Sequence, residues 1–261
     1  MNLIDRMRPK PGLRVVITAG GAGIGAAIAR GFLDAGAKVL ICDVDEAALD
    51  YFASGHPDVV TQVADVSDEA AVKSLMGAAD LRFGGLDVLV NNAGIAGPTG
   101  KVDEFTVDDI RRTLDVDVMG QFLTVRHAAA MLRKSAGAII NISSVAGRLG
   151  YGLRTPYSAA KWAIVGLTAS LAKEFGPDGV RVNAILPGVV RGPRIDGVIR
   201  ARAEAEGISF KEMEARYLKN ISLRRMVEPE DVATMALFLC SPGGANISGQ
   251  AISVCGNVET I

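Results

Sequence analysis

The stretch Thr18-Ala19-Gly20-Gly21-Ala22-Gly23-Ile24-Gly25 decides the fold of this 261-residue chain. It follows the β-branched run 14–18 and opens the segment 24–35, whose apolar residues recur at i, i+3 and i+4. Glycines in such a turn let the backbone approach a pyrophosphate, whose charge is stabilised by N–H groups at the helix start. The turn therefore predicts a dinucleotide site that includes Gly20, Gly23, Ile24 and Gly25.

Short strand patterns alternate with helical patterns along the rest of the chain. We expect strands at 14–18, 38–42, 59–64, 86–91, 138–142, 181–186 and 251–254. Strands that alternate with helices form right-handed crossovers and a mostly parallel sheet with both faces covered. We therefore predict an α/β fold: a single, doubly wound, Rossmann-type domain with about seven strands over residues 13–261, after a polar lead-in at 1–12.

The composition argues against several classes of protein. The formal net charge is −1, so no basic field is present to recruit nucleic acid or an anionic membrane. The lead-in has no apolar core of a signal peptide, and no apolar run reaches the roughly 20 residues of a membrane span. The three cysteines are widely spaced and the two histidines have no second ligand nearby. We expect reduced thiols, no metal site and a cytoplasmic protein.

Asp43 ends the second predicted strand, about 20 residues beyond the glycine turn. A carboxylate at this place accepts hydrogen bonds from the adenine ribose and would repel the 2′-phosphate of NADP. No Arg or Lys lies within the turn to bind such a phosphate. Asp43 therefore favours NAD over NADP, and the alternative is an acid that merely faces solvent at a strand end.

Tyr157 and Lys161 lie four residues apart, on one face of a helix that is expected to start near Pro156. An unperturbed phenol has a pKa near ~10 and is a poor base at neutral pH. A nearby ammonium and the positive nicotinamide ring would lower that pKa towards the range useful for general acid–base catalysis. The same spacing also occurs on ordinary helix surfaces, so the pair alone does not establish a catalytic role.

The motifs occur in the order typical of the short-chain dehydrogenase/reductase family, which the chain resembles over nearly its whole length. The resemblance adds four elements to the glycine turn and the Tyr157/Lys161 pair: Asp65-Val66, Asn91-Asn92-Ala93-Gly94, Asn141-Ile142-Ser143-Ser144 and Pro187-Gly188. One common family glycine is replaced by Ala19. Six ordered motifs are much more specific than any one of them.

The resemblance implies a role for each of these residues. Ser144 would hydrogen-bond the substrate oxygen, Tyr157 would be the general acid/base, and Lys161 would lower its pKa and bind the nicotinamide ribose. Ser143 is expected to be structural. The further cofactor contacts implied are Asp65, Val66, Asn91, Gly94, Pro187 and Gly188. The last strand of relatives supports a subunit interface, so a homotetramer is expected, although an apolar ending fits core packing equally well.

Two positions depart from the family pattern. Asp117 occupies the place of an asparagine whose backbone carbonyl, in relatives, holds a water that relays protons. A carboxylate there would preserve the backbone role but partly cancel the field of Lys161 at Tyr157, which raises the tyrosine pKa. Gly192 stands where relatives often have a threonine that binds the nicotinamide carboxamide. Backbone groups or Arg191 are the candidates to replace that contact.

The segment 191–225 is expected to form a lid over the substrate. It has nine Lys/Arg against five Asp/Glu, which indicates either an anionic substrate or a solvated helix with pairs such as Glu212/Arg216. The second interpretation is favoured for the helix charges. Guanidinium groups bind carboxylates and phosphates through paired hydrogen bonds. The candidates for such contacts are Arg148, Arg154, Arg191 and Arg194.

These observations predict an NAD-dependent dehydrogenase of a small secondary alcohol, which is a sugar, polyol or hydroxy acid. The first alternative is an NADPH-dependent ketoreductase of acyl or cyclic ketones, which Asp43 disfavours. The second is a non-catalytic dinucleotide-binding protein, which the joint presence of Ser144, Tyr157 and Lys161 disfavours.

Overall fold

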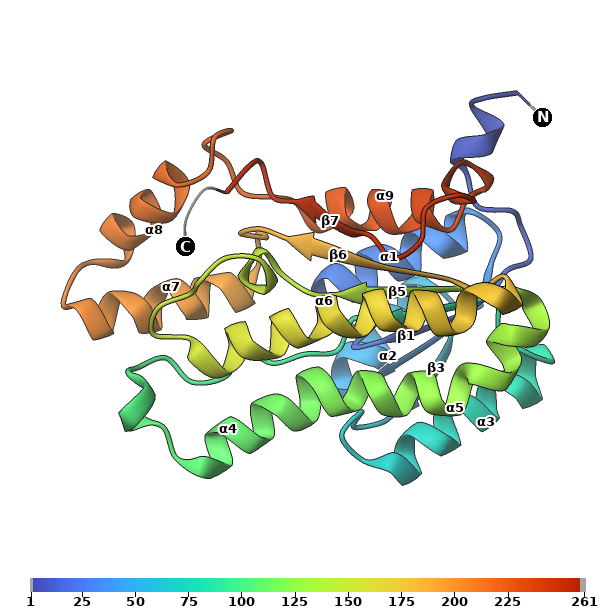
Figure 1. Cartoon of the computed structure of the whole chain (residues 1–261), viewed down its shortest axis with the longest axis horizontal. Helices are drawn as coiled ribbons and strands as arrows, with labels where there is room; N and C mark the ends of the chain where they lie inside the picture. Colours follow the sequence, from blue (N-terminus) through green and yellow to red (C-terminus); the bar gives the residue numbers. More distant parts are fainter. Residues whose placement is uncertain (1, 259–261) are drawn as a thin grey trace.

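A computed structural model describes residues 2–258 and contains one seven-stranded sheet in the order β3-β2-β1-β4-β5-β6-β7, with every pair of neighbours parallel (Figure 1). This confirms the predicted fold class and all seven predicted strands. The strands are β1 (Arg14–Thr18), β2 (Lys38–Asp43), β3 (Val60–Val63), β4 (Val88–Asn91), β5 (Ala138–Ile142), β6 (Arg181–Pro187) and β7 (Ala251–Val254).

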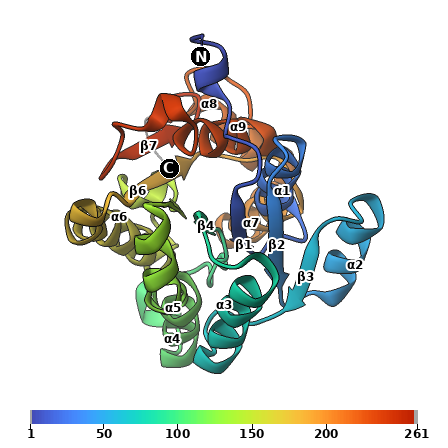
Figure 2. The ribbon, with the colours of Figure 1, turned by 90° about the vertical axis from the view of Figure 1, so that its right-hand side faces the viewer.

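Helices cover both faces of the sheet, as Figure 2 shows with the sheet between two layers. The helices packed on one face are α1 (Gly23–Asp34), α2 (Glu46–Gly55) and α9 (Pro229–Leu239). The opposite face is covered by α3 (Glu69–Phe83), α5 (Gly120–Ser135) and α6 (Thr155–Phe175). Three further helices are α4 (Val107–Leu114), α7 (Pro193–Glu206) and α8 (Phe210–Lys219).

The packing of the central strand β1 explains why its consecutive residues are apolar. Val15 and Ile17 pack into the core beneath α1, α2 and α9, whereas Val16 packs into the core beneath α3, α5 and α6. All three side chains are fully buried. Burial of each such side chain contributes about 1.5–3 kcal/mol. A strand buried on both faces therefore shows a continuous apolar run rather than an alternation.

The chain changes direction between β1 and β4, because the connections from β1 and β4 lead to opposite faces of the sheet. Hydrogen bonds join the two strand ends: Thr18 Oγ1 accepts from the N–H groups of Asn92 (3.0 Å) and Ala93 (2.9 Å). The Asn92 amide donates to the carbonyls of Thr18 (3.1 Å) and Ala19 (2.9 Å). Ligands of open α/β sheets bind at such a switch point, outside the carboxyl ends of the strands.

The two segments expected at the edges of the domain differ in structure. In the lead-in, η1 (Asp5–Met7) is a single exposed 3-10 turn. The lid segment forms α7 and α8, which extend beyond the carboxyl ends of the strands (Figure 1).

At the sheet edge the four residues of β7 are only half-buried, and the expected tetramer stays a prediction. Within residues 2–258 no helix is long and apolar enough to cross a membrane.

Arg14 and Asp87 fasten the start of β1 to the turn before β4. The Asp87 carboxylate accepts from the Arg14 backbone N–H (2.8 Å), Nε (2.8 Å) and Nη2 (2.7 Å). Partial burial alone would raise the pKa of Asp87, but the hydrogen bonds and charge of Arg14 outweigh it and lower the pKa. The strand β4 itself begins at Val88, two residues later than predicted.

We expect Asp87→Asn to lower the free energy of unfolding at pH 7 by about 1–3 kcal/mol, because charged hydrogen bonds to Arg14 are lost. A carboxyl whose folded-state pKa is depressed stabilises the fold above its unfolded pKa near ~3.9, and this stabilisation disappears as the pH falls through the folded pKa. Urea unfolding at about pH 7 and at about pH 3 measures both values. A wild-type advantage that is as large at the acidic pH as at neutral pH would contradict the assignment.

Candidate active site

A cavity of about 440 Å³ lies at the carboxyl ends of the strands. It is lined by the glycine turn and Asp43, by the residues after β4, β5 and β6, and by the lid. The expected site residues that line it are Gly23, Ile24, Asp43, Gly94, Ser144, Arg154, Tyr157, Lys161, Pro187, Gly188, Arg191 and Arg194. One concave site therefore collects residues that are distributed over most of the sequence.

The glycine turn has the shape that a dinucleotide requires. A Cβ atom at Gly25 would collide with the Ala19 carbonyl and the Asn92 amide, so only glycine fits there. Gly23 has φ +54° and a Cβ atom on it would meet nothing within 4 Å, so its backbone faces open space. Because α1 begins at Gly23, its first N–H groups are available to phosphate oxygens. The turn fits the pyrophosphate of a nicotinamide dinucleotide.

Asp43 is held at the edge of the same cavity. Its Oδ2 accepts a hydrogen bond from the Gly21 N–H (3.2 Å), and its Oδ1 accepts one from the Asp45 N–H (3.2 Å). These two bonds fix the carboxylate beside the glycine turn. An acceptor group is thus fixed on the side of the site where an adenine ribose would lie.

Ser144, Tyr157 and Lys161 come together from β5 and α6. Ser144 caps the short helix η4 (Val145–Gly147) with its Oγ, which accepts from the Ala146 N–H (3.1 Å). The Lys161 Nζ lies 5.5 Å from the centre of the Tyr157 ring and donates to the Ile142 carbonyl (3.4 Å).

Ser143 differs from its neighbour in what its hydroxyl contacts. The Ser143 Oγ donates to the Lys161 backbone carbonyl (2.8 Å) and so ties β5 to α6. This contact supports the structural role that was expected for Ser143.

Several charges act on the Tyr157 phenol. Burial disfavours the phenolate, but the Lys161 ammonium, the Arg194 guanidinium and a hydrogen bond from Ser144 together outweigh it and lower the pKa of Tyr157. The Asp117 carboxylate acts in the opposite direction and raises that pKa. The net effect moves the phenol towards the pH range in which it can exchange protons.

Asp117 forms a buried ion pair with Lys161, in which Oδ2 lies 3.2 Å from Nζ. Its Oδ1 accepts from the Ile95 N–H (2.6 Å), and its side chain is 0% exposed. Asp117 lies on the π-helical turn η3 (Asp115–Met119), between α4 and α5. Such turns re-aim side chains within a helix and are frequent at functional sites. The expected carboxylate near Lys161 is therefore in direct contact with it.

Other expected cofactor residues do not line the cavity. Asp65 is held by Ser67 and Arg112, whose hydrogen bonds and charge overcome partial burial and lower its pKa. The Asn91 amide donates to Asn141 (3.0 Å) beneath the cavity. The remaining three are packed tightly, with Gly20 against Ile41, Gly25 against Ala19, and Val66 against Gly120. Cofactor contacts of Asp65, Val66 and Asn91 stay predictions.

The four candidate arginines have different surroundings. Arg148 does not line the cavity, because its guanidinium reaches β7 and donates to the Ala251 carbonyl (2.8 Å) and Ser253 Oγ (3.2 Å). Arg191 pairs with Glu228 (2.9 Å) and is exposed. Arg194 donates to the Gly94 carbonyl (2.9 Å). Arg154 is 2% exposed and donates to the Ala96 carbonyl.

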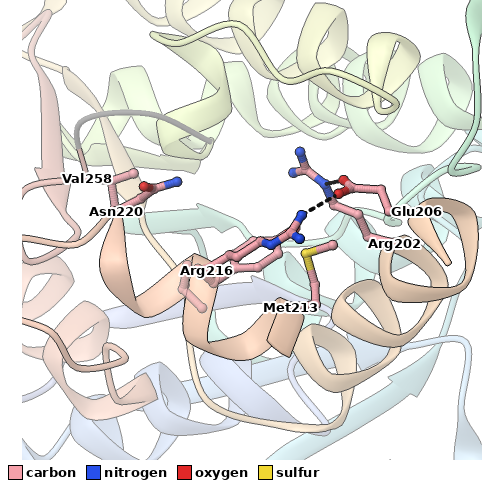
Figure 3. A pocket seen from close by; sticks show the side chains of 8 residues that line it. Arg202, Glu206, Met213, Arg216, Asn220 and Val258 are labelled. Atoms are coloured by element: carbon pink, nitrogen blue, oxygen red, sulfur yellow. Dashed lines mark hydrogen bonds and ion pairs between the residues drawn. The ribbon is translucent and has the colours of Figure 1, made fainter. Parts of the chain in front are cut away.

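Four charged residues of the lid helices pair with one another, and they include the expected Glu212/Arg216 pair. Glu206 on α7 binds Arg202 (3.1 Å) and also Arg216 on α8 (2.9 Å), as Figure 3 shows. Arg216 pairs in addition with Glu212 (2.9 Å). The Glu206–Arg216 pair joins α7 to α8, and Arg202, Glu206 and Arg216 line a second, smaller cavity of about 130 Å³.

Two tyrosines that were not predicted from the sequence also line the main cavity. The hydroxyls of Tyr151, before α6, and Tyr217, on α8, are hydrogen-bonded to each other (2.5 Å). The bond joins the lid to the loop before Tyr157. Tyr151 lies between Ser144 and Tyr157 in the sequence, which is the one signal that pointed to it.

Among residues 2–258 no group of three or more His, Cys, Asp or Glu could hold a metal ion.

Nearly the whole chain is similar to known proteins. A family model described as enoyl-(acyl carrier protein) reductase matches residues 18–257. Bovine (Bos taurus) L-fucose dehydrogenase is 36% identical, with 94% of this chain and 88% of that protein covered. Cis-4-hydroxycyclohexanecarboxylate dehydrogenase of Sinomonas cyclohexanicum is also 36% identical, over 94% of this chain and 96% of that protein.

A solved structure with the same fold is that of a single-residue variant of actinorhodin polyketide ketoreductase with NADPH. It is 30% identical, has a TM-score of 0.90, and covers 94% of this chain and 96% of that chain. Other similar structures hold NAD+ or NADH, so homologues bind nicotinamide dinucleotides of either kind. Together with the ordered motifs and the site geometry, these matches establish that the chain is an oxidoreductase of the short-chain dehydrogenase/reductase family.

Proposed function

We propose that this protein interconverts a small secondary alcohol and its carbonyl compound with NAD as the hydride carrier. The observation that carries the proposal is the position of Tyr157, which lines the same cavity as the glycine turn. The pKa of its phenol is lowered, so the phenol can exchange protons there. Relatives named for L-fucose, hydroxycyclohexanecarboxylate and butanediol support alcohols of this size.

Each residue of the site has a defined task in this proposal. In the oxidation direction the Tyr157 phenolate takes the proton of the substrate hydroxyl, and in the reduction direction the phenol returns it. Ser144 hydrogen-bonds the same oxygen and holds it against the phenol. Lys161 stabilises the phenolate by its charge and supplies a donor for the nicotinamide ribose. When bound, NAD would supply the acceptor for the hydride of the carbinol carbon.

The preference for NAD rests on Asp43. Its carboxylate, fixed beside the glycine turn, would accept hydrogen bonds from ribose hydroxyls and repel a 2′-phosphate. An NADPH-dependent ketoreductase is the second candidate, favoured by the similarity to the actinorhodin ketoreductase with NADPH. A binding protein without activity is disfavoured, because it would not need Ser144, Tyr157 and Lys161 in one cavity.

Turnover tests the proposed activity. We expect NADH to form from NAD with at least one alcohol in a panel of cyclohexanol, 2,3-butanediol, L-fucose, xylitol, 3-hydroxybutyrate and cis-4-hydroxycyclohexanecarboxylate. Tyr157→Phe should reduce kcat/KM by about 10²–10⁴-fold and still bind NADH, because only the proton-transfer group is lost. Tyr51→Phe, at a tyrosine that is 82% exposed, is the matched control. Activity that survives Tyr157→Phe would refute the mechanism.

The cofactor choice is tested by Asp43→Ser. The preference for NAD is the ratio of kcat/KM with NAD to kcat/KM with NADP. We expect this ratio to be about 10-fold or more lower in Asp43→Ser than in the wild type, because the ribose acceptor and the repulsive charge are both lost. The control is Glu46→Gln, an exposed acid in the first turn of α2. A wild type that prefers NADP would instead support the ketoreductase alternative.

Asp117→Asn tests the electrostatics of the proton transfer. Because Asp117 raises the pKa of Tyr157, its neutralisation should lower that pKa and move the acidic limb of the kcat/KM profile for alcohol oxidation to lower pH, by a few tenths to about one unit. Asn can still accept from the Ile95 N–H. Asp115→Asn, at an exposed acid on the same π-helical turn, should leave the profile in place. An unmoved profile in Asp117→Asn would show that the carboxylate has no electrostatic role.

A further inference from the structure

Arg154 is a buried charge without a counter-ion in the described structure. Its side chain ranks among the largest that are fully buried, with 2% of the residue exposed, and it lines the main cavity. Its Nη2 donates to the Ala96 carbonyl, but Nε and Nη1 have no hydrogen-bond partner among the described residues. Nε carries one and Nη1 two of the five N–H donors of a guanidinium, which stays charged at every physiological pH.

Burial of such a group is unfavourable unless something compensates it. A buried cation without a carboxylate and with unpaired N–H groups loses hydration that nothing replaces. The aromatic rings beside Arg154 compensate only in part: its guanidinium carbon lies 4.9 Å from the centre of the Tyr157 ring and 5.3 Å from that of Tyr151. Two other cations of the cavity have acidic partners, since Lys161 pairs with Asp117 and Arg191 with Glu228. The fourth, Arg194, is exposed and donates to the Gly94 carbonyl, so Arg154 alone is both buried and without a described acidic partner.

Arg154 also has a fixed spatial relation to the proton-transfer pair. It immediately precedes α6, three residues before Tyr157 and seven before Lys161. Its guanidinium carbon lies 4.9 Å from the centre of the Tyr157 ring, and the Lys161 Nζ lies 5.5 Å from the same centre. An anion on Arg154 would therefore lie close to the alcohol oxygen at Tyr157.

We propose that Arg154 binds the carboxylate of the substrate, and that the protein acts on hydroxy acids in which a few carbons separate the carboxylate from the secondary alcohol. The inference rests on the proposed alcohol dehydrogenase activity. The buried guanidinium of Arg154 carries one positive charge, and apolar side chains such as Val189, Ile195 and Val198 line the same cavity. A carboxylate carries one negative charge and accepts paired hydrogen bonds from a guanidinium, so it matches Arg154.

Matched pairs of substrates test the proposal in the wild type. The acids are 3-hydroxybutyrate and cis-4-hydroxycyclohexanecarboxylate, and their carboxamides have nearly the same shape without the charge. We expect kcat/KM to be about 10- to 100-fold higher for an acid than for its amide, mainly through KM. Equal values for acid and amide would overturn the proposal without any variant, and so would a preference for a phosphorylated polyol such as sorbitol 6-phosphate.

Variants separate substrate binding from a structural role. In Arg154→Met we expect kcat/KM for the acid to fall to about that for the amide, while kcat/KM for the amide changes much less and the affinity for NADH is unchanged. Arg154→Lys should retain part of the preference, because the charge stays but the planar fork is lost. The control is Arg148→Gln, on the same loop but directed to β7. Equal losses for acid and amide, or a loss of NADH binding, would assign Arg154 to structure or cofactor instead.

A binding measurement keeps this inference distinct from the proposed activity. Cyclohexanecarboxylate has no hydroxyl, so its binding to the NADH complex, followed by calorimetry, needs no turnover. We expect binding to the wild type and a loss of about 10-fold or more in Arg154→Met. Binding of cyclohexanecarboxylate without oxidation of any alcohol would support the carboxylate site at Arg154 and contradict the proposed activity. Oxidation of neutral alcohols without carboxylate binding would support the activity and contradict the carboxylate site.

Discussion

The hydrogen bonds between Thr18 and Asn92 hold together the ends of β1 and β4, between which the strand order reverses. The chain leaves β1 towards one face and β4 towards the other, so a crevice opens at their carboxyl ends. The glycine turn and the α6 residues Tyr157 and Lys161 line one cavity there. The proposed cofactor site and the proposed proton-transfer site are adjacent because both lie at that single switch point.

Within the crevice, charge determines what each group can do. The buried pair of Lys161 and Asp117 is neutral as a unit, yet its two members lie at different places relative to the phenol, so their effects on the pKa of Tyr157 are opposed rather than absent. Arg194 adds a second cation near that phenol. The Arg154 guanidinium carbon lies 4.9 Å from the centre of the Tyr157 ring, and among the described residues Arg154 has no acidic partner. Lys161, Arg194 and the hydrogen bond from Ser144 together outweigh burial and Asp117, so the pKa of the phenol is lowered.

The sequence was sufficient wherever local pattern determines structure. β-Branched runs predicted the seven strands, and the turn at 18–25 predicted the start of α1, because both depend on neighbouring residues. Side-chain partners distant in sequence could not be predicted in this way. Arg191 meets Glu228, Arg148 reaches β7, and Tyr151 bonds to Tyr217, and these contacts depend on how the lid and loops pack. The burial of Arg154 has the same origin.

A crystal structure of the protein with NADH and cyclohexanecarboxylate tests the central claim most directly. We expect the adenine ribose hydroxyls to bond to Asp43, the nicotinamide to lie beside Tyr157, and the carboxylate to bond to Nε or Nη1 of Arg154. A cofactor that avoids Asp43, or a carboxylate bound on the exposed lid arginines with Arg154 still unpaired, would contradict it.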